Sequence, residues 1–196
     1  MGKVKNALEI ALERAEQFGT LSKEEKEKIK EEAAVKAILG EYFQVRIDSN
    51  GLWQRMKDVK RPLLGMAQMQ LTESLGLGNA QIELQRKKEG ILAIETLKEQ
   101  PKTALIESTL NALEGLMKEY DQMKKDLLDD LRKQIEANPQ MRMQPVKTPD
   151  GKTVMKLTAS VDEAAQARFA EALSAQDAEF SNEFSALIEE LKKALR

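Results

Sequence analysis

The chain has 196 residues, of which 41% are hydrophobic and 33% are charged. It is long enough to bury a hydrophobic core and too apolar to be disordered throughout. It contains neither histidine nor cysteine, which excludes Ser-His-Asp and Cys-His catalysis, disulfides and thiolate zinc sites. We therefore expect a non-enzymatic protein with no cofactor and no bound metal.

Charge and hydropathy argue against a membrane protein and a nucleic-acid-binding protein. The formal net charge is −2, from 31 basic and 33 acidic residues, and neither half of the chain has a large excess of one sign. No apolar run approaches the roughly 18 residues that span a bilayer. Charged residues also interrupt the N-terminal segment, unlike a signal peptide. We expect a soluble cytoplasmic protein.

The first hundred residues predict a cluster of short-to-medium helices, over 4–18, 22–39, 52–60, 63–75 and 79–98. Ser22 and Glu25 have the spacing of a capping box. Pro62 stands at a first helical position, and Asn79 is suited to cap the last of these helices. The run 48–51, Asp-Ser-Asn-Gly, predicts a turn.

Two long helices follow Pro101, over 102–137 and 161–195. Seam positions spaced three and four apart characterise both. In the first they are Ile106, Leu110, Leu113, Met117, Tyr120, Lys124, Leu127 and Leu131. In the second they are Phe169, Leu173, Asp177, Phe180, Phe184, Leu187 and Leu191. Ser160 and Glu163 predict a capping box at the start of the second helix.

A β-hairpin is expected between the long helices. Pro-Asp-Gly at 149–151 lies between extended segments over 141–148 and 152–158, and such a run favours a tight hairpin turn. A chain that folds back at this turn brings the long helices side by side in antiparallel orientation. The predicted fold class is therefore mainly α: a long, coiled-coil-like antiparallel helical hairpin joined by a two-stranded β-hairpin, plus the N-terminal helical cluster.

The fold-back also predicts which seam residues face each other. Tyr120 falls opposite Ser181, beside Phe180, and the basic seam residue Lys124 falls opposite the acidic Asp177. We predict that Lys124 and Asp177 form a register pair, since a polar layer in a seam specifies alignment. The alternative is that both side chains reach solvent at the edge of the seam.

Alternation along the extended segments places five apolar residues on one face of the hairpin: Met141, Met143, Pro145, Met155 and Leu157. Two strands alone do not bury such a face. We therefore predict an interaction surface, covered either by the N-terminal helices or by the same hairpin of a second chain.

Other residue clusters give weaker hypotheses. Basic residues near Trp53 and at 86–88 would suit nucleic-acid phosphates, but ordinary solvated charge explains them too. Asp126, Asp129, Asp130 and Glu136 carry carboxylates that suggest a metal site, but their spacing on one helix spreads them apart.

The layout of 101–196, two long antiparallel helices joined by a β-hairpin, resembles a prefoldin-type chaperone subunit. The resemblance implies hairpins that assemble a barrel and helix tips that hold non-native chains. The helical region 1–100 has no counterpart in that layout. We expect a scaffold or adaptor that binds protein partners and self-associates, as a homodimer or a higher homo-oligomer. The alternative is a holdase-like chaperone; a nucleic-acid-binding protein and a carboxylate-based enzyme are less favoured.

Overall fold

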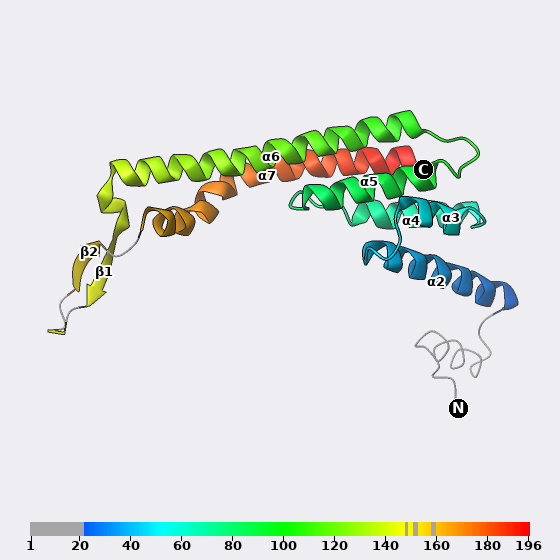
Figure 1. The fold of residues 1–196 in the computed structure, drawn as a ribbon, viewed down its shortest axis with the longest axis horizontal. Coiled ribbons are helices and arrows are strands. Elements are labelled where there is room, and N and C mark those ends of the chain that lie inside the picture. Colours follow the sequence, from blue (N-terminus) through cyan, green and yellow to red (C-terminus); the bar gives the residue numbers. More distant parts are fainter. Residues whose placement is uncertain (1–21, 148, 151–152, 158–159) are drawn as a thin grey trace, which may run out of the picture. The chain divides into compact units, whose positions relative to one another are not determined.

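The computed structural model describes residues 22–147, 149–150, 153–157 and 160–196. The side chains of residues 144–146, 155–157 and 175 lie outside this description, as does the helix expected over 4–18. The described chain is mainly helical, which confirms the mainly α part of the predicted fold class (Figure 1). Within the described residues, no helix has the length and apolar character needed to cross a membrane.

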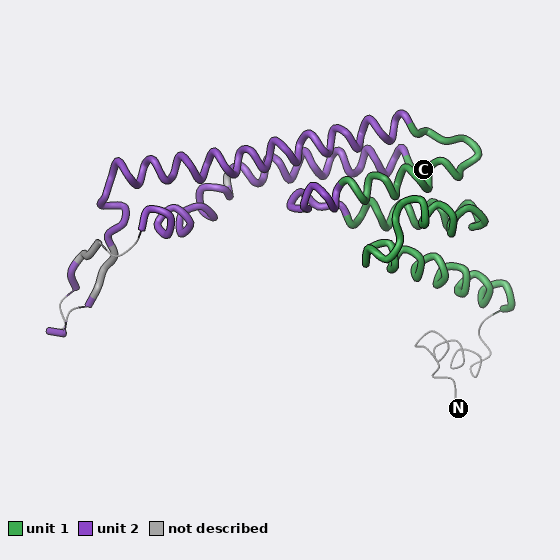
Figure 2. Tube along the Cα trace, in the orientation of Figure 1, with its two compact units in different colours: residues 1–74, 85–103, 195–196 green, residues 75–84, 104–194 purple. Residues whose placement is uncertain are grey.

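The chain divides into two compact units (Figure 2). Unit 1 comprises residues 1–74, 85–103 and 195–196, and unit 2 comprises residues 75–84 and 104–194. One of its boundaries, at 84/85, falls inside a helix of the N-terminal half.

Unit 1 is built on α2 (Lys23–Phe43), α3 (Ser49–Met56), α4 (Arg61–Glu73) and most of α5 (Gln81–Glu95). The capping box of α2 is confirmed: the Glu25 amide donates to Ser22 Oγ at 3.2 Å, and the Ser22 amide donates to Glu25 Oε2 at 2.7 Å. Pro62 lies in the first turn of α4.

Several helix boundaries differ from the sequence prediction by a few residues, and hydrogen bonds explain two of the differences. The run 48–51 opens α3 instead of forming a separate turn, because the Asp48 carboxylate accepts the Gly51 amide at 2.7 Å and caps the helix. Asn79 does not begin the next helix, because its Oδ1 accepts the Gly76 amide at 2.7 Å; α5 starts at Gln81 and ends at Glu95.

A reciprocal clamp joins the end of α2 to α5. The Arg86 guanidinium donates to the Tyr42 carbonyl, at 3.1 Å from Nε and 2.6 Å from Nη2, and also to the Ile47 carbonyl. It lies 4.2 Å from the centre of the Tyr42 ring, and the Tyr42 hydroxyl donates to the Arg86 carbonyl. Gly90 makes this close approach possible, because a Cβ there would lie 2.8 Å from Tyr42 Cε1.

Unit 2 is built on α6 (Thr103–Ala137) and α7 (Val161–Leu195), in close agreement with the predicted long helices. The Ser160–Glu163 capping box is confirmed. The two helices pack against each other in antiparallel orientation, with Tyr120 beside Phe180 at a ring-centre distance of 5.3 Å, as predicted. Nearer the strands, Arg132 Nε binds Asp162 at 2.8 Å, and Leu131 and Ile135 form a cluster with Ala164 and Ala165.

Between the long helices lie a 3₁₀ turn, η1 (Pro139–Arg142), and two short strands, β1 (Met143–Lys147) and β2 (Thr153–Leu157). The strands are paired antiparallel, with Met143 opposite Leu157 and Pro145 opposite Met155.

We predict that Gly90→Ala destabilises the protein by about 1–3 kcal/mol, the usual cost of forcing an extra methyl group into a packed site. Gly40→Ala in α2 is the matched control, because a Cβ there meets nothing within 4 Å; it should gain about 0.5–1 kcal/mol from better helix propensity. Urea denaturation followed by circular dichroism measures both. Equal stability of the two variants would contradict the clamp.

Candidate interaction surface and polar centres

The five residues of the predicted hairpin face do not all lie on the strands. Met141 lies in η1, not in a strand, and packs half-buried against the Leu131–Ile135 cluster because the 3₁₀ turn points it back to the helices. Met143 begins β1 and is 41% exposed. Pro145, Met155 and Leu157 lie on the paired strands, but their side chains fall outside the described part of the structure. The interaction role of this face stays a prediction.

Lys124 and Asp177 are linked through Tyr120 and do not form the direct ion pair that the sequence predicted. Lys124 Nζ binds Asp121 of its own helix at 2.7 Å and lies 4.4 Å from the centre of the Tyr120 ring. The Tyr120 hydroxyl donates to Asp177 Oδ1 across the helix pair at 2.5 Å. The Tyr120 phenol, not the Lys124 ammonium, therefore makes the polar contact with Asp177 across the helix pair.

This hydrogen bond changes the acid–base behaviour of Tyr120. The bond to Asp177, together with burial and the nearby negative charge, raises the pKa of Tyr120 to about 12. Because the phenol stays protonated, it remains a donor to the half-buried carboxylate. A polar layer therefore lies in the middle of an otherwise apolar seam, where a shifted register would leave the Asp177 carboxylate without this donor.

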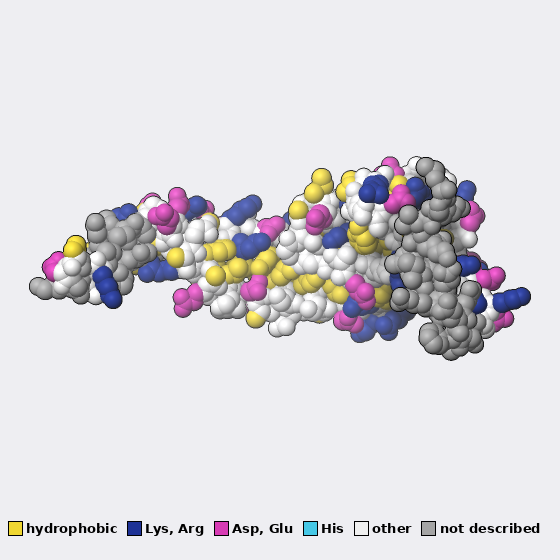
Figure 3. All heavy atoms as spheres, turned by 90° about the horizontal axis from the view of Figure 1, so that it is seen from below, with side chains coloured by type: hydrophobic (Ala, Val, Ile, Leu, Met, Phe, Trp, Pro, Cys, Tyr) yellow, Lys and Arg dark blue, Asp and Glu magenta, His cyan; other side chains and the backbone are white. Residues whose placement is uncertain are grey.

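The two long helices differ in how completely their apolar residues are buried. On α6, Leu110, Leu113 and Met117 are buried. On α7, no described side chain between residues 166 and 190 is fully buried. Half-buried apolar side chains form what we call the apolar stripe: Met123, Leu127 and Leu128 of α6, and Phe169, Ala172, Leu173, Phe180, Phe184, Leu187 and Ile188 of α7. Figure 3 shows hydrophobic side chains gathered in a band along the long helices.

An open hollow of about 380 Å³ interrupts the surface of the helix pair. Met123 and Leu127 provide its apolar part, and Glu119, Asp126 and Asp130 give it acidic walls. Among the residues that the structure describes, no three carboxylates gather closely enough to hold a metal ion.

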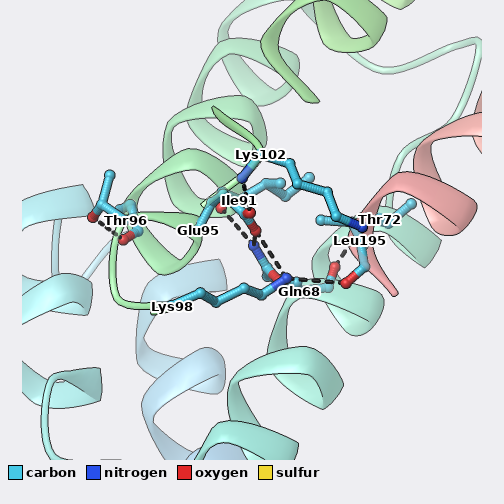
Figure 4. A network of polar contacts seen from close by, with 9 residues as sticks. Gln68, Thr72, Ile91, Glu95, Thr96, Lys98, Lys102 and Leu195 are labelled. Carbon is cyan, nitrogen blue, oxygen red and sulfur yellow. Dashed lines mark hydrogen bonds and ion pairs between the residues drawn. The ribbon is translucent and has the colours of Figure 1, made fainter. Parts of the chain in front are cut away.

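Unit 1 contains a buried polar centre that the sequence analysis missed (Figure 4). Gln68 is 0% exposed and Glu95 is 1% exposed. Gln68 Nε2 donates to the Ile91 carbonyl at 3.1 Å and to Glu95 Oε2 at 2.9 Å. Lys98 Nζ lies 2.8 Å from the same carboxylate oxygen, and the Lys102 amide donates to Glu95 Oε1 at 2.7 Å.

These donors keep the buried carboxylate ionised. Burial raises the pKa of Glu95, but the hydrogen bonds from Lys98, Gln68 and the Lys102 amide outweigh it, so the pKa lies below the ordinary glutamate value. One signal in the sequence could have revealed the centre. Gln68 stands at the inward spacing between Leu64 and Leu71, where an apolar residue is expected.

Two of the residues considered for nucleic-acid binding make hydrogen bonds inside unit 1. The Arg86 guanidinium donates to the Tyr42 and Ile47 carbonyls. Trp53 is half-buried, and its Nε1 donates to Thr96 Oγ1 at 3.1 Å. Neither side chain is therefore presented as a freely exposed phosphate-binding or base-stacking group.

We predict that Asp177→Asn lowers the pKa of Tyr120 toward 10, because it removes the negative charge that opposes ionisation. Tyrosine ionisation, followed by absorbance at alkaline pH, measures this; the Tyr120→Phe variant identifies the signal. The hydrogen bond from the protonated phenol contributes its full stabilisation of the wild-type fold below about pH 10. This stabilisation is lost as the pH rises through about 12, where Tyr120 ionises in the folded protein. An unchanged Tyr120 titration in Asp177→Asn would show that the cross-helix bond does not form.

Comparison with known proteins places the chain in one family. Residues 51–196 match a family of unknown function, DUF6657. The match covers most of the chain, so the chain belongs to this family. Neither the curated proteins nor the solved structures contain a significant match.

Proposed function

We propose that this member of the DUF6657 family is a non-enzymatic scaffold protein that self-associates through the apolar stripe of α6 and α7. The observation that carries the proposal is the incomplete burial of α7, whose described apolar side chains between 166 and 190 are all half-buried or exposed. Burial of apolar surface is the main favourable term in protein association, so a half-covered stripe gains free energy when a second surface covers it.

The partner that we propose to cover this stripe is a second copy of the chain. Two helices bury one seam between them, whereas four helices enclose a core on all sides. A second helix pair supplies an apolar stripe of the same length and pattern, and two-fold symmetry brings identical patches together. The proposed assembly is therefore a dimer with a four-helix, coiled-coil-like contact.

A holdase-like chaperone is the second candidate, because apolar residues of the strands are also exposed. Met143 is 41% exposed and Val154 is 44% exposed. In the layout that resembles prefoldin, exposed apolar strand residues would assemble the barrel, and the helix tips would hold the non-native polypeptide.

Substitution of two neighbouring alanines on α7 tests the scaffold proposal. Ala172 is half-buried in the apolar stripe, and Ala170 is exposed. We predict that Ala172→Glu weakens dimerisation by at least about tenfold, which corresponds to roughly 1.4 kcal/mol, while Ala170→Glu leaves it unchanged. Sedimentation equilibrium over a range of concentrations measures the dissociation constant, and circular dichroism checks that both variants are folded.

A wild-type chain that stays monomeric at every concentration would reject self-association. If that monomer also suppresses aggregation of an unfolded client, the holdase role replaces the scaffold role. Equal weakening by both glutamates would place the contact elsewhere.

A further inference from the structure

A groove runs along one face of α2 in unit 1. It consists of two adjoining hollows of about 330 and 170 Å³, which share Glu31, Lys60 and Leu63 as lining residues. One wall is formed by α2 and the other by the segment 58–63, which leads into α4. The lining residues of α2 recur at the spacing of a single helix face: Glu24, Glu27, Lys28, Glu31, Ala34, Val35 and Ile38.

The half of the groove nearer Ile38 is apolar, and the described residues leave part of it uncovered. Val35 and Leu63 are buried, Ile38 and Val59 are half-buried, and Ala34 is exposed. A surface of this kind gains free energy when another apolar surface covers it. Its shape, a trough beside a helix, suits a second helix that presents an apolar face.

One ion pair crosses the groove without closing it. Lys60 Nζ lies 2.6 Å from Glu31 Oε1, and the two side chains are 67% and 37% exposed. An exposed pair of this kind contributes little to stability. It therefore holds the two walls together only weakly, and a docking helix can lie over it or displace it.

The segment of the chain before α2 has an apolar face of matching length. Six apolar residues are spaced there as on one face of a helix: Val4, Leu8, Ala11, Leu12, Ala15 and Phe18. A helix over 4–18 would be about 22 Å long, and the groove face of α2, from 24 to 38, extends over about 21 Å. Only residues 19–21 separate this segment from Ser22, which caps α2. A connection this short places consecutive helices side by side in antiparallel orientation.

The two faces also match in register. If the chain reverses at about Leu21, residues whose numbers add up to about 42 face each other. The apolar positions 4, 8, 11, 15 and 18 then fall opposite 38, 34, 31, 27 and 24, which are all lining residues of the groove. Val4 meets Ile38 and Leu8 meets Ala34 in the apolar half. The small side chains of the two alanines, at 11 and 15, leave Glu31 and Glu27 room to reach solvent.

We propose that residues 4–18 form an amphipathic helix that docks in this groove of the same chain, with Val4 and Leu8 over Ile38 and Ala34. The groove is thus the docking site of the segment that precedes it, and the docked helix covers apolar surface that α2 and the segment 58–63 leave open. The proposal concerns unit 1 alone and does not depend on the self-association proposed for α6 and α7.

Disulfide cross-linking in the full chain tests the docking. The chain has no native cysteine, so Leu8→Cys with Ala34→Cys places one pair of thiols at the predicted contact. Cysteine is itself a small apolar side chain, so the contact stays apolar. The matched control is Leu8→Cys with Lys36→Cys, because Lys36 is exposed and does not line the groove. Circular dichroism checks that both double variants are folded.

The control removes the effect of the tether. Both pairs are joined by nearly the same length of chain, so an undocked segment gives them about the same effective concentration. We expect the disulfide with Ala34→Cys to form at least about tenfold faster than that with Lys36→Cys. Each rate is first corrected for the reactivity of its thiols toward a small disulfide reagent.

Two results would overturn the proposal. Equal corrected rates for the two pairs would show that the segment does not dock in the groove. A disulfide that forms only between chains, seen as a covalent dimer that disappears on dilution, would show that the segment of a second copy occupies it. The sedimentation measurement on Ala172→Glu is separate, so either proposal can fail while the other stands.

Discussion

The antiparallel contact between α6 and α7 is the constraint on which unit 2 depends. Neither helix buries its apolar seam without the other, and two specific contacts set their alignment. The Leu131–Ile135 cluster with Ala164 and Ala165 closes the end near the strands. The Tyr120–Asp177 hydrogen bond, with the Phe180 ring beside it, fixes the middle. Because α7 stays half-covered beyond these contacts, the arrangement that aligns the helices also leaves the surface that we propose for association.

Unit 1 depends on a different physical constraint, because it buries the carboxylate of Glu95. An unpaired buried charge is costly, and Glu95 is stabilised by a lysine, an amide side chain and a backbone amide. Lys98, which neutralises it, comes from the segment that follows α5. The same segment provides the Lys102 amide, the third donor to this carboxylate.

The sequence predicts the long-range layout well and the polar details poorly. The bounds of α6 and α7 follow from an uninterrupted seam between breakers such as Pro101 and Asn138, and the Ser22 and Ser160 capping boxes follow from local spacing. The partner of Asp177 could not be predicted in this way, because Tyr120 and Lys124 lie about one turn apart on α6 and either side chain is long enough to reach the second helix. The binding of Lys124 to Asp121 within its own helix decided the outcome. Met141 was wrongly placed on a strand because the 3₁₀ turn precedes β1, which begins only at Met143. The buried position of Gln68 was missed because a single polar residue in an apolar pattern does not by itself indicate a buried hydrogen-bonded centre.

The most direct test of this account is a pair of spin-label distances in one protomer. The chain has no native cysteine, so cysteine pairs at exposed positions label cleanly. Labels at Glu119 and Glu179 should give a short distance, set by the roughly 8–10 Å between packed helices. Labels at Glu119 and Gln166 should be farther apart by on the order of 10 Å, given about 1.5 Å of rise per residue. Both distances should persist when labelled chains are diluted with unlabelled ones. Long distances for both pairs, or a short distance that disappears on dilution, would contradict the antiparallel pairing within the chain.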